Sequence, residues 1–519
     1  MKRIALSLHT LLVLLGIYFL VTIQLEGFAN DPGVGWHLKT GEWITEQKQI
    51  PREDPFLSLS APNRLDTGIT SDPTTRAIQK RPWVADQWLG DYLLFQGYQA
   101  GGFPILYLSG VILFTLYFFG LLFHALRCEG SSIVAASFAA ALAFKASQIH
   151  CILRPVLLGI GLFLLTTIWL RTLLRDSRYA SSQLCRCITG ITLFFLWANI
   201  HPSFPLGFLL LALFVGHRFF ERAENLRSRT RRLRSDILFF LCCIVATVIN
   251  PYGVSLHTSI LTLGQSEYFM HLHEEWLPLN LFEPEGYFFV CLMLLGCLGM
   301  VLSMQKDGMK SQVFLLAAGL LFSLLTLRSV RMLPYASVLL SFPSARGLSI
   351  LFEQLSGSAR APWQSLFQVL AIKRPSPLLR EHGALILCYL FIVGYYGVHA
   401  RLPLIPSSFP YGPDQDLYPI QEVVALREEA KSSESPMVLA AHPNYGGIIT
   451  FFGYPEVKAI IDDRNTLIGE AFYRATLEAL TSSTPADFFR TQGVTHLLLE
   501  KQEDPTQSQK MSFHIIPLE

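Results

Sequence analysis

Charged side chains are scarce in this sequence: Asp, Glu, Lys and Arg together make up 15% of its 519 residues. A soluble domain carries about a quarter charged residues, so the composition argues against a soluble globular protein. Apolar residues make up 51%, and the charges cluster so that long uncharged runs remain. Basic residues do not interleave with aromatic ones in any patch, so nucleic acid is not expected as a partner. Membrane lipids are expected instead, because apolar runs of about 18 residues or more are long enough to cross a bilayer as helices.

Cysteine is missing from the two most hydrophilic parts of the chain. All nine cysteines lie in or beside apolar runs, and none falls within residues 26–101 or after residue 401. Neither part is therefore expected to depend on disulfides. Cys185 and Cys187 form an isolated C-x-C motif, without the second pair of ligands that a structural zinc site needs.

The apolar runs predict about eleven transmembrane helices. We place them at roughly 4–25, 102–126, 131–149, 155–174, 187–200, 203–220, 236–251, 286–304, 311–328, 332–352 and 383–400. The loops after the fourth and sixth of these are rich in arginine, whereas the stretch from Pro251 to Gly286 has no Lys or Arg and five Glu residues. Basic residues concentrate on the cytoplasmic side, so we expect a cytoplasmic N-terminus and an external position for residues 251–286.

Two domains follow from this topology. Residues 1–401 form a transmembrane domain with a large external loop at residues 26–101, and residues 402–519 form an external C-terminal domain. In the latter, the predicted strands are PMVLAAHPNYGGIITFFG, VKAIID, THLLLE and SFHIIPLE, and GEAFYRATLEAL is a predicted helix. The fold class is therefore mostly α, with a small C-terminal α/β domain outside the membrane. We expect the protein in the inner, cytoplasmic membrane of a bacterium.

Two segments of the external loop also predict helices. DPGVGWHLKTGEWI, residues 31–44, has apolar residues at loosely helical spacing. RPWVADQWLGDYLLFQGYQAGG, residues 81–102, predicts an amphipathic helix at the membrane interface, the depth that tryptophan and tyrosine prefer. The residues between these segments, 61–80, are polar and turn-rich.

Polar residues collect where the predicted spans meet the outer surface. Burying such groups is costly unless they have partners, so they are the first candidates for function. The candidates are Asp31, His37, Asp86, His150, Arg154, His201, Glu275, Trp276, Arg328 and Arg331. The predicted topology puts all of them at the same face, whereas chance would scatter them over both.

Simpler roles exist for individual members of this set. Asp31 suits a turn, and His37 suits an ordinary surface or core position on a short helix. Arg328 and Arg331 can extend to lipid headgroups. Basic residues on the outer side run against the usual orientation bias, however, which favours a specific anionic partner for both arginines.

Taken together, these residue types predict sugar transfer from a lipid-linked donor. A carboxylate just below the outer surface can act as a general base on an acceptor hydroxyl or amide. Nearby arginines match the charge and shape of a phosphate or pyrophosphate. A polyprenyl-phosphate sugar donor needs this layout, because its lipid lies in the bilayer, its phosphate at headgroup level and its sugar outside. Arg328 and Arg331 are expected to bind the phosphate, and the other candidates to line the site.

Motifs spread over most of the chain have a recognisable order. The first is DPGVGWHLKTGEWI at residues 31–44, and the others are IPREDPFLSLS (50–60), RPWVADQWLGDYLL (81–94), WANIHPSFPLG (197–207), INPYGVSLH (249–257), EEWLPLN (274–280), RSVRMLP (328–334) and NYGGIITFFGYPEVKAIIDDRNTLIGEAF (444–472). Their order and spacing resemble a branch of bacterial polytopic proteins in the GT-C glycosyltransferase superfamily. That branch typically reads D-P-D-L-W-W-H-L-x-T-G-x-W-I after the first span and N-x-x-G-G-Y-L…V-F-I-D-G-R late in the chain. The resemblance implies a GT-C-like architecture.

The resemblance also implies a catalytic role for Asp31. In GT-C enzymes such as oligosaccharyltransferases and protein O-mannosyltransferases, an acidic residue in the first outer loop is catalytic. This chain departs from the branch at two positions, since the second Asp of the pattern falls on Gly33 and the first Trp on Gly35. We therefore expect no two-carboxylate metal site, and neither a metal ion nor another cofactor. Asp462-Asp463-Arg464 replaces the D-G-R of the branch and is expected to shape the C-terminal domain.

The preferred function is a glycosyltransferase that moves a hexosyl or pentosyl group from a polyprenyl-phosphate donor to an external glycan, lipid or protein acceptor. One alternative is a transporter or flippase for a lipid-linked saccharide. Such a protein needs ionisable residues near the bilayer midplane, and Lys145 is the best candidate for one. The other alternative is a non-catalytic assembly protein that binds through its C-terminal domain, which the lost carboxylate at Gly33 leaves open.

Overall fold

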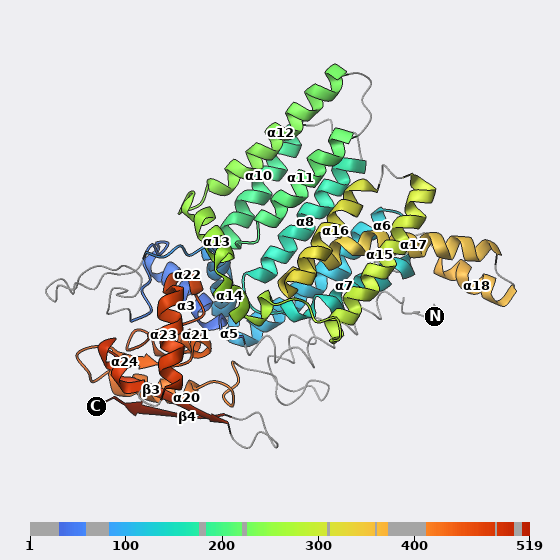
Figure 1. Cartoon of the computed structure of the whole chain (residues 1–519). Coiled ribbons are helices and arrows are strands. Elements are labelled where there is room, and N and C mark those ends of the chain that lie inside the picture. Colours follow the sequence, from blue (N-terminus) through green and yellow to red (C-terminus); the bar gives the residue numbers. More distant parts are fainter. Residues whose placement is uncertain are drawn as a thin grey trace.

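The structure is a computed structural model that describes residues 31–58, 82–175, 183–220, 226–308, 312–358, 361–371, 412–482, 485–502 and 511–518. It consists of a long helical bundle with a small α/β domain at one end (Figure 1). The predicted spans 4–25 and 383–400 and the turn-rich stretch 61–80 lie outside the described residues.

The nine other predicted spans all coincide with helices. These are α5 (Trp88–Thr115) continued by η2 (Leu116–Leu122) and α6 (Phe123–Cys128), α7 (Ile133–Ala146), α8 (Val156–Arg175), α10 (Gln183–Ile200), α11 (Pro205–Phe220), α12 (Leu226–Val248), α15 (Pro284–Asp307), α16 (Val313–Arg328) and α17 (Leu333–Ser358). By length and composition, four helices of the described part can cross a membrane, at Trp88–Cys128, Val156–Arg175, Pro284–Asp307 and Val330–Gly357. Four more are apolar but shorter. The chain is thus a multi-pass membrane protein.

Glycine contacts set the closest approach between helices of the bundle. Helices α15 and α17 cross where Gly299 faces Gly347, and a Cβ atom at Gly299 would lie 1.9 Å from the carbonyl oxygen of Pro343. Small residues at such crossings let helix backbones approach closely where lipid supplies no hydrophobic driving force. Aromatic side chains fill much of the remaining interior, among them Phe114, Phe163 and Trp197.

The external loop contributes two helical segments that lie against each other. Helix α3 (Val34–Gln47) packs on the first part of α5, where a Cβ atom at Gly41 would lie 2.3 Å from the carbonyl oxygen of Asp91. The predicted amphipathic segment begins as a helix only at Trp88 and continues into the span through a kink. The kink falls at Gly101–Gly102, and Gly102 has a φ of 68°, in the region that favours glycine.

The C-terminal domain is an α/β unit, as predicted. Its four-stranded sheet has the order β2-β1-β3-β4, built from β1 (Met437–Ala440), β2 (Val457–Ala459), β3 (His496–Gln502) and β4 (Met511–Pro517). Strand β1 runs parallel to β2 and β3, and β4 runs antiparallel to β3. The helices are α20 (Ile420–Ala430), α21 (Pro443–Gly453), α22 (Asn465–Ile468), α23 (Glu470–Thr481) and α24 (Pro485–Thr491).

One predicted strand is wrong. In the segment PMVLAAHPNYGGIITFFG, only Met437–Ala440 forms a strand, and Pro443–Gly453 forms helix α21. Pro443 stands in the first turn, where a missing N–H costs nothing. The His442 side chain accepts a hydrogen bond from the Asn444 backbone N–H and caps the helix.

Helix α21 is also where the α/β domain meets the external loop. A Cβ atom at Gly35 of α3 would lie 2.2 Å from the carbonyl oxygen of Gly447, and one at Gly447 would lie 2.3 Å from that of Pro32. The two helices therefore cross at glycine on both sides. This explains why the position of the first tryptophan in the branch pattern holds Gly35 here.

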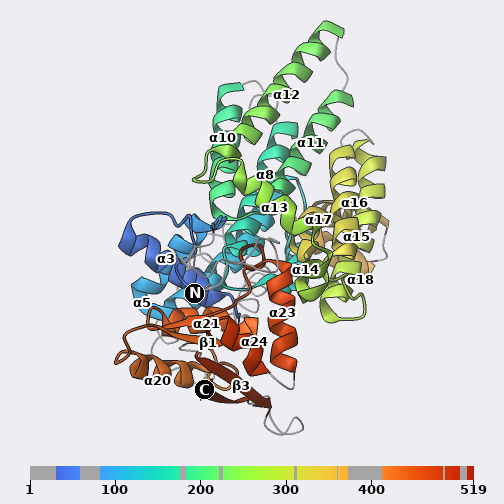
Figure 2. The same cartoon turned by 60° about the vertical axis from the view of Figure 1, so that its left-hand side comes forward.

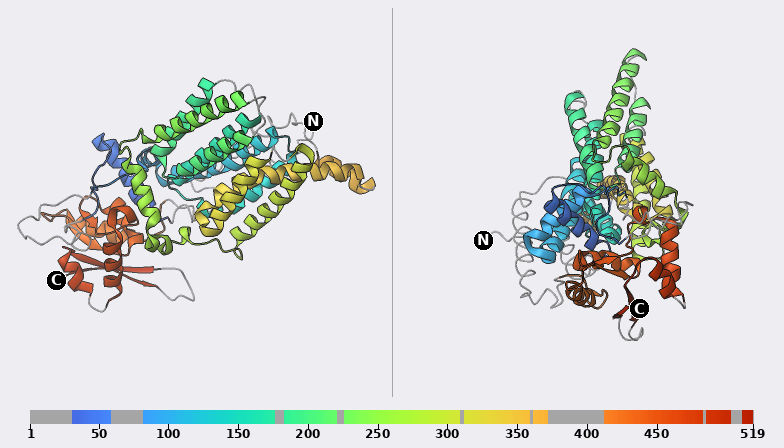
Figure 3. Two further views of the ribbon diagram at one scale, coloured as in Figure 1. Left: turned by 45° about the horizontal axis from the view of Figure 1, so that its top comes forward. Right: turned by 90° about the vertical axis from the view of Figure 1, so that its left-hand side faces the viewer.

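Short helices of the loop between α12 and α15 complete the junction. They are α13 (Ser255–Gln265), α14 (Glu267–Leu272) and the turn η4 (Glu274–Trp276), and Figure 2 shows α13 and α14 beside the α/β domain. The turn η4 contacts η6 (Val330–Met332) at the start of α17. Helix α18 (Ala361–Leu370) projects at the opposite end of the bundle, far from the α/β domain (Figure 3).

Candidate functional site

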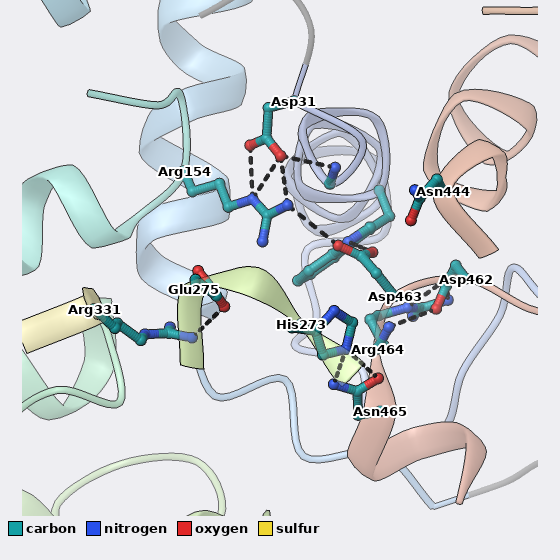
Figure 4. A network of polar contacts seen from close by, with 12 residues as sticks. Asp31, Arg154, His273, Glu275, Arg331, Asn444, Asp462, Asp463, Arg464 and Asn465 are labelled. Atoms are coloured by element: carbon teal, nitrogen blue, oxygen red, sulfur yellow. Dashed lines mark hydrogen bonds and ion pairs between the residues drawn. The ribbon is translucent and has the colours of Figure 1, made fainter. Parts of the chain in front are cut away.

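Arg154 lies at the centre of a polar cluster where the bundle meets the α/β domain (Figure 4). Its Nε donates to both oxygens of Asp31, at 2.8 and 2.6 Å, and its Nη2 donates to Asp31 as well. The same Nη2 lies 3.3 Å from Oδ2 of Asp463, which follows β2 in the C-terminal domain. One guanidinium thus bridges carboxylates from the two ends of the chain.

Asp31 is held firmly in this cluster. Its side chain is 3% exposed, and its Oδ1 also accepts a hydrogen bond of 3.1 Å from the Gly33 backbone N–H. Asp31 comes immediately before α3, so the turn into that helix and the Arg154 guanidinium together fix its carboxylate. The turn role and the functional role considered for this residue are therefore compatible.

Gly33 and Asp463 lie on either side of the same guanidinium. A Cβ atom at Gly33 would lie 2.8 Å from Cζ of Arg154, so a side chain at this position would collide with it. Asp463 supplies a second carboxylate from the other side and also accepts a hydrogen bond of 2.6 Å from Nε1 of Trp36. Burial raises the pKa of Asp463 above its ordinary value, although Arg154 opposes the shift.

The motif Asp462-Asp463-Arg464, expected to shape the C-terminal domain, also makes contacts outside that domain. Besides the contact of Asp463, the buried Arg464 donates from Nη1 to Asp54 of the external loop at 2.7 Å and from Nε to Asp462 at 2.8 Å. Its guanidinium carbon lies 4.6 Å from the ring centre of Trp83, and the rings of Trp36 and Phe56 are also in cation–π range. The motif therefore fastens the C-terminal domain to the external loop.

A second arginine–carboxylate pair lies beside Arg154. Nη1 of Arg331 donates to Oε1 of Glu275 at 2.5 Å, and the Arg331 guanidinium lies 4.5 Å above the ring of Trp276. Burial would raise the pKa of Glu275, but Arg331 and Arg154 outweigh it and lower the pKa overall. In Figure 4, Glu275 lies between the two arginines.

All three predicted site histidines are buried around these pairs. His37 on α3 makes a 2.6 Å contact from Nδ1 to Asp91, and His201 makes one of 2.8 Å from Nδ1 to Ser203. Both ring nitrogens of His150 are buried without a hydrogen-bond partner in the described part of the chain. Burial lowers the pKa of all three, that of His150 to about 4, so all are neutral at neutral pH.

Two predicted site residues lie apart from the pairs. Arg328, the last residue of α16, is exposed and makes no ion pair with any residue that the structure describes. Asp86 is half-buried in the turn before α5, where burial raises its pKa to about 6 and Arg331 opposes the shift. The sequence did not lead to Asp463, Asp91 or Asp54 as site residues, and their partners lie 54 to 427 residues away in the chain.

His271, His273 and Glu274 have a spacing in the sequence that could hold a metal ion, but both histidine side chains have other partners in the structure. Nδ1 of His271 contacts the backbone oxygen of Glu267, and His273 shares hydrogen bonds with Asn465 of the C-terminal domain. Within the ranges described, no group of three or more His, Cys, Asp or Glu side chains is arranged to hold a metal ion.

No protein-family model matches the chain, and no curated protein sequence does. Solved structures do. Archaeal oligosaccharyltransferase AglB from Archaeoglobus fulgidus, in complex with an inhibitory peptide and a dolichol-phosphate, is similar with a TM-score of 0.58 and 13% identity over 95% of this chain and 69% of that chain. The oligosaccharyltransferase of the same organism in the apo form has a TM-score of 0.57 and 13% identity, over 96% of this chain and 70% of that chain. ArnT from Cupriavidus metallidurans in the apo state has a TM-score of 0.47 and 13% identity, over 98% of this chain and 97% of that chain.

The likeness to AglB extends over nearly the whole chain, including the α/β domain and the helical bundle. It concerns the fold, since the two sequences share 13% identity. The expected architecture, a multi-pass helical membrane domain followed by a small α/β domain, is therefore confirmed, and AglB has a similar fold.

Proposed function

We propose that this protein is a glycosyltransferase that moves a sugar from a polyprenyl-phosphate donor to an acceptor on the external side of the membrane. The observation that carries the proposal is the cluster around Arg154 and Arg331, at the junction of the bundle and the α/β domain. Carboxylates and arginines from five distant segments meet there, and three buried neutral histidines surround them. The fold supports the proposal too, because AglB, named as an oligosaccharyltransferase, carries a dolichol-phosphate in its structure.

In the proposed reaction, the acceptor hydroxyl or amide attacks the anomeric carbon of the donor sugar. The bond from that carbon to the phosphate oxygen breaks, and the polyprenyl phosphate leaves with the electron pair. Asp31 accepts the proton of the acceptor group, the role of a general base. Arg154 orients the Asp31 carboxylate through three hydrogen bonds, and Arg331 binds the departing phosphate.

The position of Lys145 weakens the transporter alternative. This lysine lies in the last turn of α7, and its Nζ donates to Oε1 of Gln148 at 2.6 Å. It is thus close in the chain to His150 and to the polar cluster, rather than midway along a span. A transporter for a lipid-linked saccharide would need ionisable groups near the midplane.

Replacing Asp31 with Asn tests the proposal. The amide keeps the shape of the side chain but removes its charge and its basicity, so transfer is expected to fall by about 10²–10⁴-fold while donor binding persists. Asp86→Asn is the matched control, because Asp86 makes no ion pair with any described residue, and a smaller loss is expected for it. The measurement is the production of surface glycans in cells that carry each variant as the only copy.

Binding of undecaprenyl phosphate to purified variants in lipid nanodiscs is measured alongside. Full glycan production by Asp31→Asn would remove this residue as the base and favour the transporter or assembly alternative. Failure of the wild-type protein to bind the lipid phosphate would overturn the donor class.

A further inference from the structure

We propose that Glu275 occupies Arg331 only until the donor binds: the phosphate displaces Glu275, which then passes to Arg154. This inference rests on the proposed function and assigns Glu275 a role beyond lining the site. It makes the Glu275–Arg331 pair a placeholder for a phosphate oxygen, and donor binding an exchange of one anion for another.

The geometry of the two arginines favours such an exchange. Arg331 uses a single nitrogen, Nη1, to bind Glu275, although a guanidinium presents five N–H donors and binds phosphate best through two of them at once. Arg154 uses Nε and Nη2 for its carboxylates, and its Nη1 makes no hydrogen bond within the described chain. The charges of Arg331 and Arg154 both lower the pKa of Glu275, and Figure 4 shows Glu275 between the two arginines. Arg154 is therefore the second arginine to which the Glu275 carboxylate passes when a phosphate takes its place on Arg331.

The pair is not what holds the surrounding backbone together. The N–H of Val330 donates to the carbonyl oxygen of Leu277 at 2.8 Å, and the Ser329 hydroxyl donates to that of Glu275 at 3.2 Å. Arg331 also stays in place over the ring of Trp276 when its carboxylate partner leaves. The turn η4 and the start of α17 thus remain joined during the exchange.

His150 provides an independent sign that a ligand belongs here. Its side chain is buried at 3% exposure, and neither ring nitrogen has a hydrogen-bond partner in the described part of the chain. The charge of Glu275 raises the pKa of His150 and that of Arg331 lowers it, so His150 lies within electrostatic range of both. A neutral imidazole has one N–H donor, and a phosphate oxygen bound to Arg331 is a suitable acceptor for it. Buried polar groups without partners are uncommon in folded proteins, and a phosphate bound to Arg331 would give His150 a partner.

The test measures the affinity of the full-length protein in phosphatidylcholine nanodiscs for undecaprenyl phosphate. Glu275→Gln removes the competing charge, so this variant is expected to bind the lipid phosphate about tenfold more tightly than the wild type, the order of one charge-assisted hydrogen bond. Glu274→Gln is the matched control, because Glu274 is the neighbour of Glu275 in the chain, carries the same charge and has an exposed side chain. It is expected to bind like the wild type. Glu275→Ala should tighten binding in the same direction as Glu275→Gln.

Arg331→Ala separates this inference from the proposed function. It is expected to weaken binding about tenfold or more, in the wild-type and in the Glu275→Gln background alike. If Arg331→Ala weakens binding but both Glu275 variants bind no more tightly than the wild type, the exchange is wrong and the donor site stands. If the wild type and all variants fail to bind, the proposed function falls and the exchange falls with it. Equal tightening by Glu274→Gln would also overturn the exchange, because the effect would then be one of general charge.

Discussion

Replacement of Arg464 by Met should loosen the C-terminal domain from the external loop. Arg464 is enclosed by Asp54, Asp462 and three aromatic rings, and the side chains of both carboxylates are fully buried. Removing one member of a buried ion pair leaves uncompensated charge and typically costs about 3–5 kcal/mol. Here two carboxylates lose their partner, so we expect a loss at the upper end of that range. Burial already raises the pKa of Asp462 to about 6, and loss of the guanidinium raises it further.

The assay compares thermal unfolding and limited proteolysis of the purified protein in detergent. Early cleavage between the bundle and the C-terminal domain is the expected sign of Arg464→Met. Arg474→Ala is the matched control in the same domain, because the Arg474–Glu470 pair is 50% and 41% exposed and such pairs contribute about 0–1 kcal/mol. The triple variant Asp54→Asn, Asp462→Asn and Arg464→Met should recover part of the loss, since no buried charge remains. Wild-type stability of Arg464→Met would refute the anchoring role.

Three further outcomes are expected. Asp463→Asn keeps an acceptor for Trp36 but removes the longer of the two Arg154 ion pairs, so glycan production should fall by less than in Asp31→Asn; an equal loss would assign the two carboxylates one shared role. Asp86→Asn should stabilise the protein by about 1–3 kcal/mol at pH 7.5, measured by thermal unfolding. The reason is that the pKa of Asp86 is about 6 in the folded state and 3.8 ordinarily, so the wild-type protein loses stability as the pH rises from about 4 to about 6. The gain should vanish below pH 4, and a constant gain would contradict its origin. Single cysteines at Glu267 and Thr491 should react with an impermeant thiol reagent in spheroplasts, whereas one at Arg229 should be protected; the reverse pattern would invert the topology.

The sequence was sufficient to predict the helical bundle because its signal is local. A run of apolar residues long enough to cross a bilayer needs no information from the rest of the chain. Short apolar runs contain less information about secondary structure. In α21, the composition of IITFFG suits a buried strand, and only the His442 cap and Pro443 in the first turn indicate a helix. The outer-face candidates were found by the same local reasoning, since each lies in a predicted outer loop or at the outer end of a predicted span.

Contacts between distant segments could not be predicted in this way. Arg328 and Arg331 are three residues apart, and the sequence gives both the same role. The structure separates them, because α16 ends at Arg328 and the extended backbone of Ser329, with φ −151° and ψ 121°, turns the chain so that Arg331 meets Glu275. Asp463 was missed for a related reason. Its partner Arg154 lies in another domain, and only folding shows that Gly33 leaves space for that guanidinium.

The charges of the cluster constrain how an anionic donor enters it. Asp31, Asp463 and Glu275 carry three negative charges against the two positive charges of Arg154 and Arg331, and the surrounding histidines are neutral. Adding a phosphate to this excess of negative charge is unfavourable unless a carboxylate moves or takes up a proton. Glu275 is the carboxylate with a second arginine to move to, and Asp463 is the one whose pKa burial already raises. The C-terminal domain, by supplying Asp463, therefore takes part in the charge balance of the site as well as covering it.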